Sequence, residues 1–90
     1  MSRVRVEVRG RVQGVFFRAE ARARAESLGL SGWICNEPDG SVTAVFDGDP
    51  ERVRSMVDWC RRGPAGARVD EVQVTEEAET EEARGGFRVV

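Results

Sequence analysis

The stretch that decides the fold runs Val8-Arg9-Gly10-Arg11-Val12-Gln13-Gly14-Val15-Phe16-Phe17-Arg18. It joins an alternating segment, Arg3 to Arg9, to a helical pattern that begins near Phe17. Its two glycines can adopt backbone angles that other residues resist. A glycine-bearing turn before a helix can direct several amide N–H groups into one concavity, where the helix dipole adds positive potential. Since Arg18 adds a planar guanidinium suited to phosphate oxygens, the stretch predicts a phosphate-sized anion site.

The composition is that of an ordinary globular protein and bounds the possible functions. The 90 residues are 40% hydrophobic and 33% charged, with a formal net charge of −2. These values predict one soluble domain that spans residues 1–90 and buries roughly 60–65% of the surface of its unfolded chain. No apolar run approaches the roughly 20 residues of a membrane span, and no signal peptide opens the chain. We therefore expect a cytoplasmic protein with no membrane partner.

Charged and apolar residues alternate from Arg3 to Arg9, which is typical of a strand with one buried face. The row of arginines on this strand has two interpretations, a solvated sheet face or a nucleic-acid surface. The net charge is negative, and the aromatic residues that single-strand RNA readers use for stacking are not interleaved with the arginines. We therefore favour a solvated face and expect no nucleic-acid partner.

The remaining segments alternate between helical and extended patterns. Apolar residues at spacings of three and four predict a helix from Phe17 to Leu28, which Gly29 ends. The acidic run between Thr75 and Gly86, with Glu76, Glu77, Glu79, Glu81 and Glu82, is typical of a solvated loop. The other predicted elements are a hairpin of strands Gly32–Glu37 and Ser41–Asp47, a helix from Asp49-Pro50 to Gly63-Pro64, and strands Arg68–Thr75 and Phe87–Val90.

This order of elements predicts an α+β fold. It runs strand, helix, strand, strand, helix, strand, with a short final strand counted separately. Two helices at those positions cover one face of an antiparallel sheet of four to five strands, which is the ferredoxin-like split βαβ sandwich. No linker, repeat or low-complexity segment indicates a second domain.

The side chains that the sequence lacks narrow its chemistry. It has no His, no Lys and no Tyr, and all fourteen basic residues are Arg, so the commonest general base and the Schiff-base nucleophile are absent. Cys35 and Cys60 have no Cys-x-x-Cys spacing, so we expect reduced thiols and no zinc site, with a disulfide between them left open. The chain remains well suited to phosphoryl transfer, because enzymes catalyse that reaction mostly by positioning the reactants and neutralising charge.

Two motifs resemble the signatures of the acylphosphatases, small enzymes that hydrolyse carboxyl–phosphate mixed anhydrides. The first motif is Val8–Arg18, and the second is Gly32–Val42 with Gly48 beyond it. Gly63–Asp70 also resembles the segment that follows the second helix of that family. The resemblance covers nearly the whole chain, and two long motifs at the expected separation are far more specific than either one alone.

The resemblance implies an enzyme that hydrolyses small-molecule acyl phosphates to carboxylate and inorganic phosphate without a metal or cofactor. It implies that the Arg18 guanidinium binds the phosphate and that the Asn36 amide positions the attacking water. The backbone N–H groups that would hold the phosphate are those of Gln13, Gly14, Val15, Phe16 and Phe17. Family members often carry an aromatic residue and a Thr at the positions of Glu20 and Ala21, so Arg18 lacks the support of that hydroxyl here.

Other interpretations stay open at this point. Without the resemblance, Asn36 beside Pro38-Asp39-Gly40 is typical of a turn-forming residue. The main rival to an enzyme is a ferredoxin-like module that binds RNA or a small ligand, which predicts salt-dependent oligonucleotide binding without hydrolysis. Similar domains occur in longer hydrogenase-maturation proteins, and a copper-chaperone module is disfavoured because Cys-x-x-Cys is absent. We expect a monomer.

Overall fold

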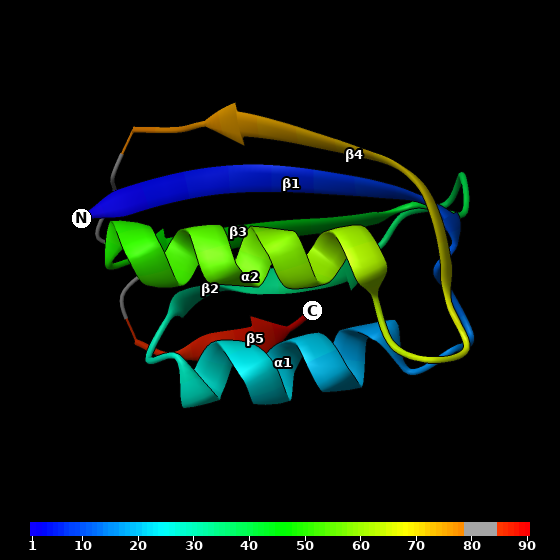
Figure 1. Ribbon diagram of the computed structural model, residues 1–90, viewed down its shortest axis with the longest axis horizontal. Helices are drawn as coiled ribbons and strands as arrows, with labels where there is room; N and C mark the ends of the chain where they lie inside the picture. Colours follow the sequence, from blue (N-terminus) through cyan, green and yellow to red (C-terminus); the bar gives the residue numbers. More distant parts are fainter. Residues whose placement is uncertain (79–84) are drawn as a thin grey trace.

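The computed structural model describes residues 1–78 and 85–90, which form one five-stranded sheet and two helices (Figure 1). The order of elements agrees with the order expected from the sequence. The elements are β1 (Ser2–Arg11), α1 (Phe17–Ser27), β2 (Ser31–Asn36), β3 (Val42–Gly48), α2 (Pro50–Arg62), β4 (Arg68–Glu76) and β5 (Phe87–Val89).

The strands lie in the order β4-β1-β3-β2-β5, so β1 and β3 are neighbours at the centre of the sheet. The pairs β1–β4, β1–β3 and β2–β3 are antiparallel, as expected. The prediction of a purely antiparallel sheet is wrong at one edge, because β5 pairs with β2 in parallel, with Gly32 opposite Phe87. The chain must return to the starting end of β2 before β5 begins, and no local sequence pattern specifies that return. The sheet is therefore mixed, within the ferredoxin-like class.

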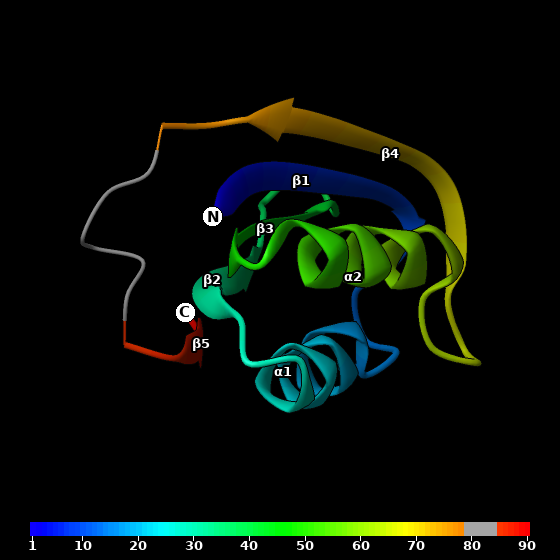
Figure 2. The same ribbon diagram turned by 60° about the vertical axis from the view of Figure 1, so that its left-hand side comes forward.

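Both helices cover the same face of the sheet, and the core lies between them and the strands (Figures 1 and 2). The valines of β1 at positions 4, 6 and 8 point to this side and are buried. Phe46 of β3 stacks on Phe87 of β5, with ring centroids 5.5 Å apart. Each large apolar side chain buried in this way stabilises the fold by about 1.5–3 kcal/mol relative to an exposed one.

The second helix has the ends that its sequence predicts. The Asp49 carboxylate accepts hydrogen bonds from the N–H groups of Glu51 and Arg52, at 3.1 and 3.2 Å, and Pro50 opens the first turn. Gly63 closes the helix with φ at 70°, an angle that glycine adopts readily. The buried residues of this helix are Val53, Met56, Val57, Trp59 and Cys60.

The first helix is one residue shorter than predicted. It ends at Ser27, and Leu28 is the half-buried residue that follows the last turn. Phe17, Ala21 and Ala25 are its buried residues. The Phe17 ring packs against Trp59 of α2, with centroids 5.2 Å apart, and this contact fixes the start of α1 against the core. Neither helix in the described ranges has the length and apolar character needed to cross a bilayer.

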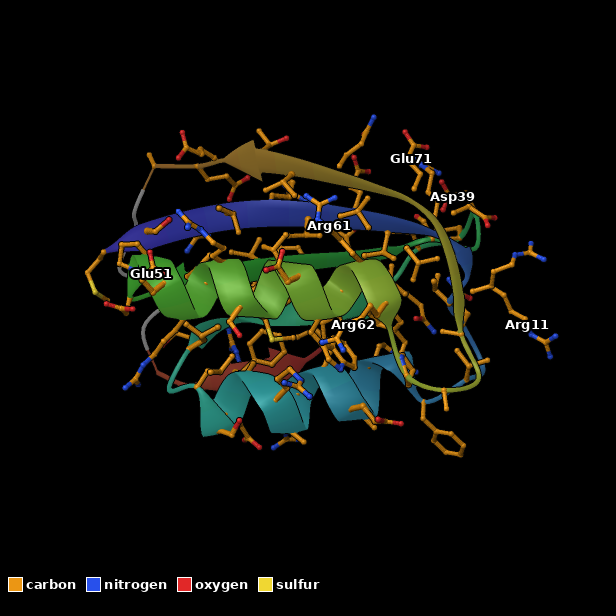
Figure 3. All side chains as sticks on the ribbon, viewed as in Figure 1. Arg11, Asp39, Glu51, Arg61, Arg62 and Glu71 are labelled. Atoms are coloured by element: carbon orange, nitrogen blue, oxygen red, sulfur yellow. The ribbon has the colours of Figure 1, made fainter. Side chains whose placement is uncertain are left out.

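The arginines of β1 lie on the sheet face opposite the helices and are paired with carboxylates. Glu77 accepts from the Nε atoms of both Arg3 and Arg5, at 3.4 and 3.0 Å. Arg9 lies 3.0 Å from Asp39, in the turn between β2 and β3. Arg11 instead points away from the body of the molecule (Figure 3). This pairing neutralises the charge of the face internally, and the Arg3 side chain is only 9% exposed.

Only part of the acidic segment that we predicted to be a solvated loop lies within the described residues. The strand β4 continues to Glu76, one residue further than predicted, and Glu77 is tied to β1 by its two arginines. The hydrogen bond from Arg5, with the charge of Arg5 and the hydrogen bond and charge of Arg3, lowers the pKa of the Glu77 carboxyl below its ordinary value of 4.5. The other three acidic positions of the run, Glu79, Glu81 and Glu82, lie outside the described residues.

Candidate active site

A cavity of about 570 Å³ opens where the loop between β1 and α1 approaches the end of β2. In Figure 1 this loop and the β2–β3 turn lie at the same end of the molecule, on the right. The volume falls within the range of ordinary small-molecule sites. The residues that line it are Val12, Gly14, Phe16, Phe17, Arg18, Ala19, Arg22, Asn36 and Val89.

The two glycines of the loop serve different purposes. Gly10 lies in β1 with φ at 133°, where a Cβ atom would come within 2.2 Å of the carbonyl oxygen of Arg68. This glycine therefore lets β1 approach β4 at the point where their register shifts. Gly14 has φ at 75° and open space around it, so its positive angle serves the turn itself.

Phe16 is held in an unusual backbone conformation. Its φ and ψ are 65° and 20°, in the left-handed region, which a non-glycine residue adopts rarely and at some energetic cost. Gly14 also has a positive φ, whereas that of Val15 between them is not positive. Such alternation of handedness turns successive N–H groups toward one side and forms an anion-binding concavity. The Phe16 side chain is 78% exposed, so its packing does not account for this conformation.

The N-terminus of α1 is open, in contrast to that of α2. The residue that precedes α1 is Phe16, whose side chain makes no capping hydrogen bond, whereas Asp49 caps α2. Within residues 1–78 and 85–90, no protein group accepts a hydrogen bond from the N–H groups of Gly14 to Phe17. The first N–H groups of a helix carry partial positive charge, so this end of α1 attracts an anion.

Arg18 lies in the first turn of α1, half-buried at the wall of the cavity. It forms no ion pair or hydrogen bond with the part of the chain that the structure describes. Unlike the paired arginines Arg3, Arg5 and Arg9 of β1, Arg18 places an unpartnered guanidinium beside an open helix N-terminus. It adds a full positive charge and a planar set of donors to the same concavity.

Asn36 is the last residue of β2 and lines the cavity with Arg18. Its Oδ1 atom is buried, and no described group donates a hydrogen bond to it. A buried amide oxygen without a donor costs stability, and such atoms in proteins usually hold a water or a ligand. The Asn36 oxygen is therefore an available hydrogen-bond acceptor at the end of β2 that lines the cavity.

Gln13 has a role that the sequence analysis did not predict. Its Nε2 atom donates two hydrogen bonds, to the carbonyl oxygens of Glu37 and Ser41, each 2.8 Å long. The side chain thus ties the loop to the β2–β3 turn that follows Asn36. We expected this residue to offer its backbone N–H to the phosphate, and neither it nor Val15 lines the cavity. Of the five predicted loop residues, Gly14, Phe16 and Phe17 do so.

Four lining residues were not among the predicted site residues: Val12, Ala19, Arg22 and Val89. Arg22 lies one helical turn after Arg18, and its spacing of four is the sequence signal that places both on one face of α1. Val89 reaches the cavity because β5 pairs with β2, a contact that the sequence does not specify.

The two cysteines do not supply a reactive thiolate. Both are free thiols. Burial raises the pKa of the Cys60 thiol from 9.0 to about 12. The pKa of Cys35 is also raised, by partial burial and the charge of Glu37. In residues 1–78 and 85–90, no three His, Cys, Asp or Glu side chains come together as a metal site.

Comparisons with known proteins find acylphosphatases both by sequence and by structure. The sequence model of the Acylphosphatase family matches residues 4–89. An acylphosphatase of Rubrobacter xylanophilus is 58% identical over 83 residues, which are 92% of this chain and 76% of that protein. The crystal structure of an acylphosphatase from Bacillus subtilis superimposes with a TM-score of 0.94, at 33% identity, and covers 100% of this chain and 99% of its own. The acylphosphatase structure from Coxiella burnetii gives 0.93 at 36% identity, covering 99% and 92%.

Proposed function

The chain belongs to the acylphosphatase family, and on that premise we propose that it hydrolyses the carboxyl–phosphate anhydride of acyl phosphates through Arg18 and Asn36. The products are a carboxylate and inorganic phosphate. The support for these roles is that a free guanidinium, an unpartnered amide oxygen and an uncapped helix N-terminus surround one cavity.

The phosphate group binds at the N-terminus of α1. Backbone N–H groups of the loop from Gln13 to Phe17 donate to its oxygens, with those of Gly14, Phe16 and Phe17 nearest the cavity. The Arg18 guanidinium neutralises part of the dianion. Because these donors are held by the loop and the helix, they need little reorganisation as charge shifts during the reaction.

Asn36 positions the nucleophile. A water molecule donates a hydrogen bond to Oδ1 and directs a lone pair of its oxygen toward phosphorus. The new P–O bond forms on one side while the bond to the acyl oxygen breaks on the other, and its electron pair leaves with the carboxylate. Holding water and phosphate in this alignment supplies much of the acceleration.

The proton of the water passes to an oxygen of the substrate's own phosphate. No His, Lys or Tyr is available as a base, and both thiols are kept protonated at neutral pH by their raised pKa values. A carboxylate is a good leaving group, so it departs without a general acid. The mechanism uses no metal and no organic cofactor.

Hydrolysis of acetyl phosphate in the presence of a metal chelator tests this function directly. We expect turnover that is unaffected by the chelator and inhibited by inorganic phosphate. The rival RNA- or ligand-binding function predicts no hydrolysis and an oligonucleotide affinity that falls with salt. The carboxylates that pair with Arg3, Arg5 and Arg9 give that rival little support. An absence of turnover would overturn the proposal.

The proposal extends to the protein as a whole. Residues 1–90 act as a single acylphosphatase-like domain, as a monomer in the cytoplasm and without a nucleic-acid partner.

A further inference from the structure

The cavity has more room than a phosphate group needs. About 570 Å³ would hold an acyl group as well as the phosphate. Away from Arg18 and Asn36, the walls include the apolar side chains of Val12, Ala19 and Val89. A second cation, Arg22, interrupts this apolar surface.

Arg22 follows Arg18 by four residues along α1. A step of four residues advances about 6 Å along a helix and returns to nearly the same face. The two guanidinium groups are therefore carried by successive turns at the wall of one cavity. That spacing suits a substrate with a phosphate at one end and a second anionic group a few atoms away.

The Arg22 guanidinium has donors to spare. Its Nε atom lies 3.5 Å from Oε2 of Glu26, a long contact between side chains that are each about half exposed. Among the described residues, neither of its terminal nitrogens has a hydrogen-bond partner. Exposed pairs of this kind are weak, so an anion in the cavity competes readily with Glu26.

We propose that Arg22 is a specificity-determining residue that favours acyl phosphates whose acyl group carries a second negative charge. This inference rests on the proposed acyl phosphate hydrolysis and adds a substrate class to it. The carboxylate or phosphate at the far end of the acyl group accepts from the free nitrogens of Arg22. Glu26 orients Arg22 when the cavity is empty and weakens its hold on the substrate.

The test uses two substrates with the same four-carbon chain, succinyl phosphate, which ends in a carboxylate, and butyryl phosphate, which does not. The measured quantity is the ratio of their kcat/KM values in the wild type and in Arg22→Gln. We expect the succinyl-to-butyryl ratio to fall about fivefold in Arg22→Gln, because succinyl phosphate loses the contact to its carboxylate and butyryl phosphate has no such contact to lose. The change should appear mainly in KM, because Arg22 contacts the acyl group and not the reacting atoms.

Two further variants distinguish a direct contact between Arg22 and the substrate from a general effect of the protein's positive charge. Glu26→Gln removes the competitor and should raise the ratio. Arg61→Gln removes the same charge from α2, outside the cavity, and should leave the ratio unchanged (Figure 3). An unchanged ratio in Arg22→Gln, or an equal fall in Arg61→Gln, would overturn the inference while leaving the hydrolysis intact. A wild type that hydrolyses neither substrate would overturn the proposed function itself.

Discussion

Arg18, in the first turn of α1, and Asn36, at the end of β2, line the same cavity, and neither finds a protein partner there among the described residues. Folding alone does not require this arrangement, because the buried Oδ1 atom of Asn36 reduces stability when no group donates a hydrogen bond to it. A dianion bound between them would satisfy both, the guanidinium directly and the amide oxygen through a water.

Replacing Arg18 by Gln should lower kcat for acetyl phosphate on the order of 10³-fold or more, as for other arginines that neutralise phosphoryl-transfer transition states. The thermal unfolding midpoint should change little, because Arg18 has no partner in the described protein to lose. Steady-state kinetics in chelator measure the first effect and circular dichroism the second. Arg54→Gln is the control, since Arg54 is an exposed residue of α2 that pairs with Glu51. A rate near that of the wild type would exclude the assigned role.

Replacing Asn36 by Ala should lower kcat to a similar degree while competitive inhibition by inorganic phosphate is retained, because water placement is lost and anion binding is not. Asn36→Asp offers a sharp contrast. Its carboxylate has nearly the same shape but repels the phosphate dianion, so the inhibition constant for phosphate should rise. If Asn36→Ala weakened phosphate binding as much as Asn36→Asp does, the residue would be holding the anion and not the water.

Replacing Gln13 by Ala removes the two hydrogen bonds that join the loop to the carbonyl oxygens of Glu37 and Ser41. Both carbonyls keep a backbone donor, from Gly40 and Glu37, so we expect a loss of about 1–2 kcal/mol in the free energy of unfolding. Phosphate inhibition should also weaken, because the loop is held less firmly. Urea unfolding and inhibition kinetics measure the two effects.

The matched control for Gln13→Ala is Gln73→Ala. Gln73 lies on the exposed strand β4, where its amide contacts Glu71 at 3.4 Å. Its removal should change neither stability nor inhibition measurably. Equal effects in the two variants would show that the tie between loop and turn is unimportant.

Cys60 should make the protein less stable at alkaline pH. Burial raises the pKa of its thiol from 9.0 to about 12, so the folded state holds a proton that the unfolded state releases. The stability that this provides is complete below about pH 9 and is lost as the pH rises toward about 12, by on the order of 4 kcal/mol over the whole range.

This dependence can be measured cleanly because the chain has no Lys and no Tyr to titrate between about pH 9 and 11. Urea unfolding at a series of pH values should show the loss in the wild type and a much flatter profile in Cys60→Ala. Cys35→Ala is the control, since Cys35 is only half-buried and most of the slope should remain. A steep slope in Cys60→Ala would assign the effect to another group.

The parts of the fold that the sequence predicted are those encoded locally. The Asp49-Pro50 start of α2 and its Gly63 end depend on residues within one turn, and both were predicted correctly. The alternation of charged and apolar residues along β1 likewise identified the strand's buried valines. The parallel pairing of β5 with β2 was missed, because it joins segments separated by most of the chain and leaves no periodic signal.

In the candidate site, too, some features could be predicted from the sequence and others depend on contacts between distant segments. Arg18 and Asn36 were assigned through the family resemblance, and the structure brings both to one cavity, although their roles remain predictions. The side-chain bonds of Gln13 depend on how the loop meets the β2–β3 turn in three dimensions. Their geometry could not be inferred from residue types, and the sequence analysis assigned only the backbone N–H of Gln13 to the site.

The position of β5 has a practical consequence for work with this enzyme. Val89 forms part of the cavity wall, and the N–H of Val90 donates to the carbonyl oxygen of Ile34 on β2, at 2.9 Å. An affinity tag or fusion partner attached after Val90 would begin within two residues of bound substrate, where it could obstruct entry or fray the edge strand. Purification handles therefore belong before Met1, because the N-terminus lies at the end of the molecule opposite the loop (Figure 1).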